Sequence, residues 1–341
     1  MEYVKLGNTG LEVSKICLGC MSFGDPEKWI HSWVLNEEES RKIIKKSLDI
    51  GINFFDTANV YGLGASEEIL GRALKDYASR DEIVIATKVS GSMGKGPNKS
   101  GLSRKAIMNE VDASLKRLGV EYIDILYIHR WDYNTPIEET MEALHDLVKA
   151  GKVRALGASA MYGYQFYNMQ LAARDNGWTP FSAMENHYNL LYREDERELL
   201  PICKQMKVSL MPYSPLAAGH LARPQWKSES LRGTTDRVAM GKYDKTEAED
   251  MQIVKRVAEL AEKYNCKMSQ IAIAWQWAKG ILSPIIGATK TQYLDDSAGA
   301  FDIKLTAEDL AYLEEPYVPH EIVGAIDKNP AQGVILLDEK K

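Results

Sequence analysis

Short apolar runs alternate with amphipathic segments from about residue 15 to residue 300. The runs are four to seven residues long and rich in β-branched and apolar residues, which predicts buried strands. Eight strands are expected, at residues 15–19, 52–55, 82–88, 123–128, 153–157, 181–184, 208–213 and 283–287. Between them, apolar positions recur every three or four residues, as in helices that bury one face. The clearest such segments are 38–51, 66–78, 103–119, 136–151 and 247–265.

The ends of these helical segments carry capping residues. Gly51, Gly119 and Gly151 stand where a helix would end in a left-handed conformation. Ser103 and Pro136 stand at two expected helix starts. The predicted helix boundaries are therefore supported by local chemistry as well as by periodicity.

Eight strand and helix alternations in 341 residues predict an α/β fold, a (β/α)8 TIM barrel with one closed parallel sheet. A doubly wound sheet is the competing architecture. Its dinucleotide-binding motif GxGxxG does not follow the first strand, so the barrel is favoured.

The whole chain, residues 1–341, is expected to form a single barrel domain with two additions to a barrel of about 15–300. Residues 1–14 predict a hairpin that turns at Asn8-Thr9-Gly10 and covers the N-terminal mouth of the barrel. The C-terminal extension, 301–341, begins with a helix at 305–315, and its last part, after Pro330, is expected to be mobile. Two long loops, 91–101 and 214–250, are expected to cover a ligand at the C-terminal face.

Composition narrows the class of protein. The chain has 42 Lys and Arg against 48 Asp and Glu, a formal charge of −6, and no basic run, which argues against nucleic-acid binding. It has no stretch of 18 apolar residues and no basic segment followed by an apolar run at its start, which argues against a membrane span and a signal peptide. We therefore expect a cytoplasmic protein with a small-molecule substrate; a homo-oligomer is compatible with the sequence.

Four cysteines, Cys17, Cys20, Cys203 and Cys266, are too scattered for a disulfide framework. Cys17 and Cys20 have CxxC spacing, but a zinc ribbon needs a second such pair and a redox CxxC usually opens a helix. We expect reduced, mostly buried thiols and no metal.

Four ionisable residues follow or end predicted strands: Asp56 with Tyr61, then Lys88, then His129. The C-terminal ends of barrel strands are where such folds build active sites. A carbonyl reduced by hydride needs a proton at its oxygen, and a tyrosine hydroxyl can donate one. Tyr61 is the expected proton donor, Lys88 would lower the pKa of that tyrosine, and Asp56 would hold Lys88. His129 would orient the substrate oxygen.

Long motifs around these residues resemble the aldo-keto reductases. They include NFFDTANVYGLGASEEILGRAL (53–74), SLKRLGVEYIDILYIHRWD (114–132), ENHYNLL (185–191) and YSPLAAGHL (213–221). The resemblance runs from residue 5 to residue 296 and is greatest to the bacterial branch related to potassium-channel β-subunits. It implies a barrel that reduces aldehydes and ketones with NADPH, and a catalytic tetrad of Asp56, Tyr61, Lys88 and His129.

The resemblance also implies a cofactor site. Tyr213 would stack on the nicotinamide ring, Ser159 would bind its carboxamide, and Lys290 would meet the 2′-phosphate that distinguishes NADPH from NADH. The other cofactor-binding residues that it implies are Met21, Glu185, Ser214, Leu216, Gly219, Gly287, Tyr293 and Asp296, of which Ser214, Leu216 and Gly219 would hold the pyrophosphate and Asp296 the adenine.

Three residues depart from the family pattern. Ala160 stands where most members have Asn, and Glu185 where Gln is common. Tyr293 replaces a longer polar residue. An ionised glutamate can only accept a hydrogen bond, whereas glutamine also donates. These changes put cofactor affinity in doubt, and leave the chemical step unaffected.

Aromatic side chains are the candidates for the substrate pocket: Trp29, Trp33, Trp131 and Tyr188, with Met21 beside them. They favour apolar or aromatic aldehydes, or the face of a sugar. Two other functions stay open: an NADPH-binding redox sensor or regulatory subunit with low turnover, and a lyase in which Lys88 forms a Schiff base. The sequence leaves the physiological substrate and the preferred reaction direction open.

Overall fold

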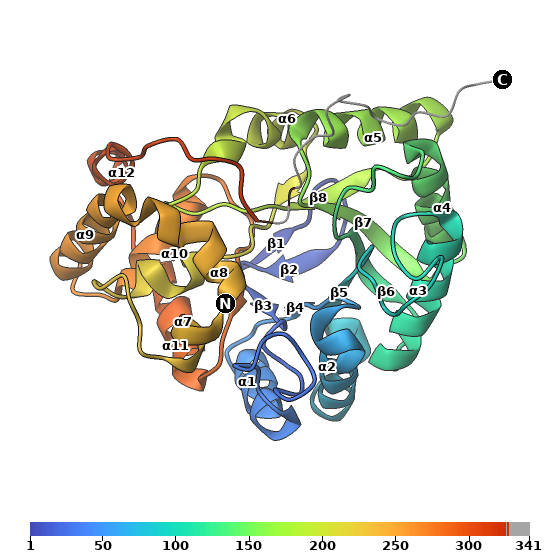
Figure 1. Cartoon of the computed structure of the whole chain (residues 1–341), viewed down its shortest axis with the longest axis horizontal. Coiled ribbons are helices and arrows are strands. Elements are labelled where there is room, and N and C mark those ends of the chain that lie inside the picture. The colour runs from blue at the N-terminus through green and yellow to red at the C-terminus, as the bar shows by residue number, and fades with distance from the viewer. Residues whose placement is uncertain (325, 327–341) are drawn as a thin grey trace.

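The computed structural model describes residues 1–324 and residue 326. In this part of the chain, eight parallel strands form a central barrel, hydrogen-bonded in the order β10-β3-β4-β5-β6-β7-β8-β9 (Figure 1). Two backbone bonds, from Leu282 N to Leu210 O at 3.1 Å and from Ile285 N to Pro212 O at 3.0 Å, join β10 to β9 and close the ring. The strands are β3 (Cys17–Gly19), β4 (Phe54–Asp56), β5 (Val84–Val89), β6 (Ile123–Ile128), β7 (Val153–Ser159), β8 (Phe181–Glu185), β9 (Ser209–Leu210) and β10 (Ile285–Gly287). The predicted (β/α)8 barrel is confirmed.

Helices surround the barrel (Figure 1). Each of the five predicted segments is a helix, and Ser103 caps α3 by accepting a hydrogen bond from the backbone of Ala106. The surrounding helices are α1 (Glu37–Asp49), α2 (Ala65–Tyr77), α3 (Arg104–Leu118), α4 (Ile137–Lys149), α5 (Gly163–Asn176), α6 (Leu199–Gln205), α9 (Glu247–Lys263), α10 (Met268–Ala278) and α11 (Thr291–Ala298). Within the described residues, no helix is both long and apolar enough to cross a membrane.

The N-terminal hairpin closes the barrel floor, as predicted. Its strands β1 (Tyr3–Lys5) and β2 (Glu12–Ser14) pair antiparallel. Leu6 and Val13 are fully buried against interior barrel residues such as Phe54 and Tyr127. The N-terminal end of the barrel is therefore sealed by apolar packing, and ligands must enter from the opposite end.

The long loop 214–250 contains two short helices that the sequence did not predict, α7 (Leu231–Thr235) and α8 (Arg237–Tyr243). Each starts at a polar side chain that accepts from the helix backbone: Ser230 from Gly233 and Asp236 from Ala239. The loop is therefore an ordered part of the fold.

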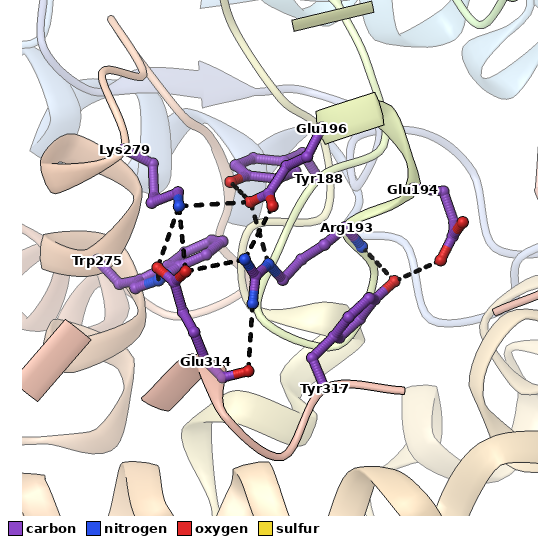
Figure 2. A network of polar contacts seen from close by, with 8 residues as sticks. All are labelled: Tyr188, Arg193, Glu194, Glu196, Trp275, Lys279, Glu314 and Tyr317. Carbon is purple, nitrogen blue, oxygen red and sulfur yellow. Dashed lines mark hydrogen bonds and ion pairs between the residues drawn. The ribbon is translucent and has the colours of Figure 1, made fainter. Parts of the chain in front are cut away.

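A polar network fastens the C-terminal segment to the barrel (Figure 2). The Arg193 guanidinium, in the loop after β8, contacts the carboxylates of Glu196 and Glu314 at 2.8 Å each. Glu314 ends α12 (Ala307–Glu314), and its other contacts reach Trp275 and Lys279 on and beside α10. The C-terminal helix predicted at 305–315 is confirmed, and the mobility predicted after Pro330 falls outside the described residues.

Beyond α12 the chain runs toward the C-terminal face of the barrel. Glu194 accepts from the Tyr317 hydroxyl at 2.8 Å and from the His320 backbone at 2.7 Å. A Cβ placed on Gly324 would lie 3.7 Å from the Tyr213 hydroxyl. The C-terminal segment therefore borders the predicted cofactor site.

Candidate active site

The predicted catalytic side chains leave neighbouring strands at the same end of the barrel. Asp56 is the last residue of β4, Lys88 the penultimate residue of β5, and His129 follows β6 directly. Tyr61 begins a short 3-10 helix, η1 (Tyr61–Gly64), shortly after β4. The strand register brings together residues that lie far apart in the sequence.

Lys88 is the centre of this group. Its side chain is completely buried, and its Nζ lies 2.5 Å from Asp56 Oδ2, 3.0 Å from the carbonyl oxygen of Thr57 and 3.3 Å from the Tyr61 hydroxyl. A buried ammonium needs a carboxylate and further acceptors to offset its lost hydration. Lys88 therefore joins Asp56 to Tyr61, as the sequence predicted.

The Tyr61 hydroxyl is protonated in this setting. Burial raises the pKa of Tyr61, Lys88 opposes that rise, and Asp56 and Glu185 add to it. The predicted lowering by Lys88 is present, but the net shift is upward, because burial outweighs the ammonium. A phenol with a raised pKa keeps its proton at neutral pH, as a general acid must.

His129 faces the same tyrosine. The two rings meet edge to face with centroids 5.7 Å apart. Burial, together with the charges of Lys88 and Arg130, lowers the pKa of His129 well below its usual value. A neutral imidazole donates one hydrogen bond only, so His129 can offer a single N–H to an oxygen held beside Tyr61.

Glu185 joins the group unexpectedly. It is the last residue of β8 and is buried, and its Oε2 lies 3.3 Å from Lys88 Nζ. The sequence interpretation placed it against the carboxamide and did not connect it to Lys88. The signal was available, because Glu185 ends a strand just as Asp56 does.

Tyr213, the predicted nicotinamide platform, has close neighbours. The His187 ring stacks on it with centroids 5.3 Å apart and planes inclined by 6°. Lys242 Nζ lies 4.7 Å from the Tyr213 ring centroid. Ser159 and Glu185 are register partners on β7 and β8, so the two residues predicted at the carboxamide are adjacent.

Ala160, which follows Ser159, adopts a left-handed backbone conformation with φ of 47°. Asn tolerates this conformation better than Ala does, because its side chain can hydrogen-bond locally. The Asn that the family resemblance leads one to expect at this position fits the backbone found here.

The segment after Tyr213 has an unusual backbone and lies beside a polar cavity. Ser214 and Gly219 have φ of 56° and 96°, and a Cβ on Gly219 would lie 2.7 Å from the Arg223 guanidinium. A cavity of about 390 Å³ within the long loop is lined by both basic and acidic side chains, among them Arg223, Lys227, Arg232, Asp236, Asp244 and Glu247. The remaining predicted pyrophosphate residue, Leu216, precedes the short 3-10 helix η4 (Ala217–Ala222) that contains Gly219.

The residues predicted at the adenosine end form a separate group around the end of β10. Gly287 ends β10, Lys290 precedes α11, and Tyr293 and Asp296 lie within that helix. Lys290 is exposed, with its Nζ 5.9 Å from the Tyr293 ring centroid. An exposed cation at a helix start can accept an anionic group from solvent.

Comparison with known proteins gives the family. The aldo/keto reductase family model matches residues 15–317. The chain belongs to the aldo-keto reductase family. It is 45% identical to a versiconal hemiacetal acetate reductase of Aspergillus parasiticus, over 94% of this chain and 98% of the relative. It is 44% identical to a putative aryl-alcohol dehydrogenase of Schizosaccharomyces pombe (95% and 98%) and 43% identical to an aldo-keto reductase of Alternaria alternata (92% and 91%).

This aldo-keto reductase is therefore an oxidoreductase, and its reductase-named relatives support carbonyl reduction in general. Members of the family generally use NADH or NADPH. The three relatives are fungal proteins and none is named as a channel subunit, so they do not support the narrower placement near bacterial channel-related reductases.

The residues predicted to line the substrate pocket differ in their burial and in their distance from Tyr61. Trp29 lies beside Tyr61, the predicted proton donor, with the two ring centroids 6.3 Å apart. Trp33 is buried beneath the guanidinium of Arg232, 4.3 Å from its ring centroid. Met21 and Trp131 are half-buried. Among the substrate candidates, Trp29 is thus the one that contacts the tetrad.

Tyr188, which the sequence predicted to line the substrate pocket, lies in the core instead. It is fully buried in a second apolar cluster, its ring lies 5.1 Å from that of Trp275, and its hydroxyl donates to Glu196 (Figure 2). Its neighbours in the ENHYNLL motif belong to the site, but alternation along the extended chain directs this side chain into the core. Tyr188 therefore does not line the substrate pocket.

The reductase has four free cysteines among its described residues. Cys17 lies in the barrel interior and Cys20 in the outer core, so the two side chains of the CxxC face different ways. Burial raises the pKa of both thiols well above the usual value. The residues that the structure describes contain no group of His, Cys, Asp or Glu side chains that could hold a metal ion.

Proposed function

We propose that this chain reduces aldehyde or ketone groups of small molecules with NADPH, and that Tyr61 is the general acid. The observation that carries the proposal is the buried Lys88 ammonium, bonded to both Asp56 and Tyr61. Such an ammonium stabilises the phenolate that remains when Tyr61 gives up its proton. Asp56 fixes the ammonium in place.

The remaining residues of the tetrad complete the proton transfer. The Tyr61 hydroxyl donates its proton to the substrate oxygen as negative charge develops there. His129, neutral because of its burial, donates a second hydrogen bond to that oxygen and orients it. When bound, the nicotinamide cofactor supplies the hydride.

The residues around the long loop fit a dinucleotide. Arg223 Nε is buried without a hydrogen-bond partner, although the guanidinium lies beside Gly219. An unused buried donor beside the backbone of Gly219 is suited to phosphate oxygens. We propose that Arg223 binds the pyrophosphate with Ser214, Leu216 and Gly219. Ser159 and Tyr213 would hold the nicotinamide.

Lys290 would select NADPH by pairing with its 2′-phosphate, near Gly287, Tyr293 and Asp296. Fluorescence titration of the wild type and of Lys290→Ala with NADPH and NADH tests this. We expect the wild type to prefer NADPH and the variant to bind both about equally. Equal affinity of the wild type for both nucleotides would contradict the role of Lys290.

An aromatic carbonyl is the substrate class that Trp29 favours, because the indole would flank a ring held at Tyr61. One of the relatives is named as a putative aryl-alcohol dehydrogenase, which agrees with this class. Cytoplasmic location and assembly into a homo-oligomer stay predictions from the sequence.

Tyr61→Phe tests the function. We expect it to bind NADPH nearly as the wild type does and to lose turnover of an aromatic aldehyde by about 10² or more. Tyr77→Phe is the matched control, because its hydroxyl contacts only surface residues of α1 among the described contacts. Unchanged turnover in Tyr61→Phe would refute the assignment. If no member of a panel of aromatic and sugar aldehydes causes the NADPH absorbance to fall, the regulatory alternative is favoured.

A further inference from the structure

Two carboxyl groups contact the catalytic ammonium. Lys88 Nζ lies 2.5 Å from Asp56 Oδ2 and 3.3 Å from Glu185 Oε2, and none of the three side chains is more than 3% exposed. The two carboxyl groups come from β4 and β8, on different sides of the barrel. This buried cluster contains one more acid than the tetrad requires.

The charges in the cluster do not balance if both acids are ionised. One ammonium and two carboxylates sum to −1, and an uncompensated buried charge is expensive. Asp56 Oδ1 and Glu185 Oε2 are also buried without a hydrogen-bond donor. One proton added to the pair would remove the net charge and supply the missing donor.

Glu185 is the acid that takes this proton. Its contact with Lys88 is the longer of the two, so it gains less from the ammonium. Burial, followed by the neighbouring Asp56, raises the pKa of Glu185 to about 8, although Lys88 opposes the shift. The two carboxyl groups also shift each other's pKa, because Glu185 lowers that of Asp56 and Asp56 raises that of Glu185, which suits an acid beside a carboxylate.

We propose that Glu185 is a positioning residue that is protonated in the active enzyme, donates a hydrogen bond to Asp56, and on losing its proton weakens Tyr61 as an acid. This rests on the proposed role of Tyr61. With Glu185 neutral, Lys88 carries a single counter-charge and can stabilise the Tyr61 phenolate. With Glu185 ionised, the cluster becomes negative and opposes that phenolate.

The other titratable groups around Glu185 do not change charge over the same range. Cys17 on β3 and Tyr127 on β6 face it, and burial raises the pKa of both well above the usual values. His129 stays neutral because its pKa is lowered. Lys242, over the Tyr213 ring, also changes charge in this range, because burial lowers its pKa to about 8. An activity change between pH 7 and pH 9 is therefore assigned to the pair of acids only if Glu185→Gln removes it.

The test is the pH profile of kcat/KM for an aromatic aldehyde at saturating NADPH. With a pKa of about 8 for Glu185, about a tenth of the wild type keeps the proton at pH 9, so we expect activity to fall about tenfold there. Glu185→Gln is always neutral and should lack this fall. Glu142→Gln, an exposed change on α4, should keep the wild-type profile.

Infrared difference spectra of the cofactor-free protein give a second readout. The wild type at pH 6.5 should show the carbonyl band of a protonated carboxylic acid, and Glu185→Gln should lack it. Absence of this band from the wild type would overturn the proposal, as would a wild-type pH profile in Glu185→Gln. Equal turnover of Tyr61→Phe and wild type would instead remove the proposed function on which the inference rests.

If Glu185 acted only in cofactor binding, Glu185→Gln would give a different result. Glu185→Gln would then change KM for NADPH while kcat kept its alkaline fall, and that outcome would also overturn the proposal. The expected result is the reverse: kcat of Glu185→Gln at pH 9 exceeds that of the wild type about tenfold, because the variant lacks the alkaline fall.

Discussion

Replacing Lys88 with Met tests whether the buried ammonium stabilises the fold as well as the reaction. Met keeps an unbranched, similarly long side chain and removes the charge. The ion pairs described for Asp56 and Glu185 both end on Lys88, so the variant leaves two buried carboxyl groups without a cation. Removing one partner of a buried pair typically costs about 3–5 kcal/mol, which we expect near pH 8.

The cost of Lys88→Met should depend on pH. Without the ammonium, the folded-state pKa values of Asp56 and Glu185 rise further above their unfolded values of about 4. A carboxyl group with a raised folded pKa binds protons that the unfolded chain releases, so stability falls as pH rises above about 4. The variant should therefore be much closer to the wild type at pH 5.5 than at pH 8.5.

Urea unfolding followed by tryptophan fluorescence at pH 5.5 and pH 8.5 measures this difference. Lys88→Met combined with Asp56→Asn should recover part of the stability lost at pH 8.5, because one buried charge is gone. A loss that is equal at both pH values, or greater at pH 5.5, would refute the reasoning. An unchanged wild-type midpoint in the single variant would refute it as well.

Four further substitutions test packing, helix propensity and one buried ion pair. Gly71→Ala on α2 should lower the urea midpoint, because the new Cβ would lie 2.1 Å from a backbone oxygen of α3. Gly241→Ala on α8 meets nothing within 4 Å and should stabilise the protein by about 0.5–1 kcal/mol. A raised midpoint in the first variant, or a lowered one in the second, would contradict the corresponding expectation. Leu6→Ala in the hairpin should lower the free energy of unfolding by about 2–5 kcal/mol in the same assay. A loss below about 1 kcal/mol would mean that packing of Leu6 against the barrel interior contributes little to stability. Burial lowers the pKa of His320, but its hydrogen bond and ion pair with Asp250 outweigh burial and leave the pKa raised. The contribution of His320 to stability is therefore present below about pH 6.5 and lost as pH rises through the raised pKa. His320→Gln should lower the urea midpoint at pH 6 more than at pH 9.

The sequence predicted the barrel because buried parallel strands carry a strong apolar signal. All eight strands were located within a few residues, and Ser103 was correctly identified as a helix cap. Helix α10 was missed because buried residues occupy almost its whole length, so it lacks the polar face that marks an amphipathic helix. Helices α7 and α8 are short and depend on their caps, which periodicity does not detect.

The candidate site was predictable where its residues end strands. Asp56, Lys88 and His129 were placed by strand ends, and Tyr61 by its distance from one of them. Burial was less accessible from sequence, which is why the direction of the Tyr61 pKa shift and the core position of Tyr188 were not foreseen. Both depend on neighbours contributed by distant segments.

The position of Glu185 beside Lys88 depends on closure of the sheet into a barrel, which the order of strand ends along the sequence does not reveal. Glu185 lies 97 positions after Lys88 in the sequence, and the strands β6 and β7 lie between β5 and β8. Closure of the barrel carries β8 back toward β4 and β5 across the interior, so side chains at these ends can meet over its centre. Glu185, which its motif predicts to bind the cofactor, is thereby also a neighbour of Lys88. Its carboxyl group makes the site more negative when it loses its proton, which the glutamine expected there could not do.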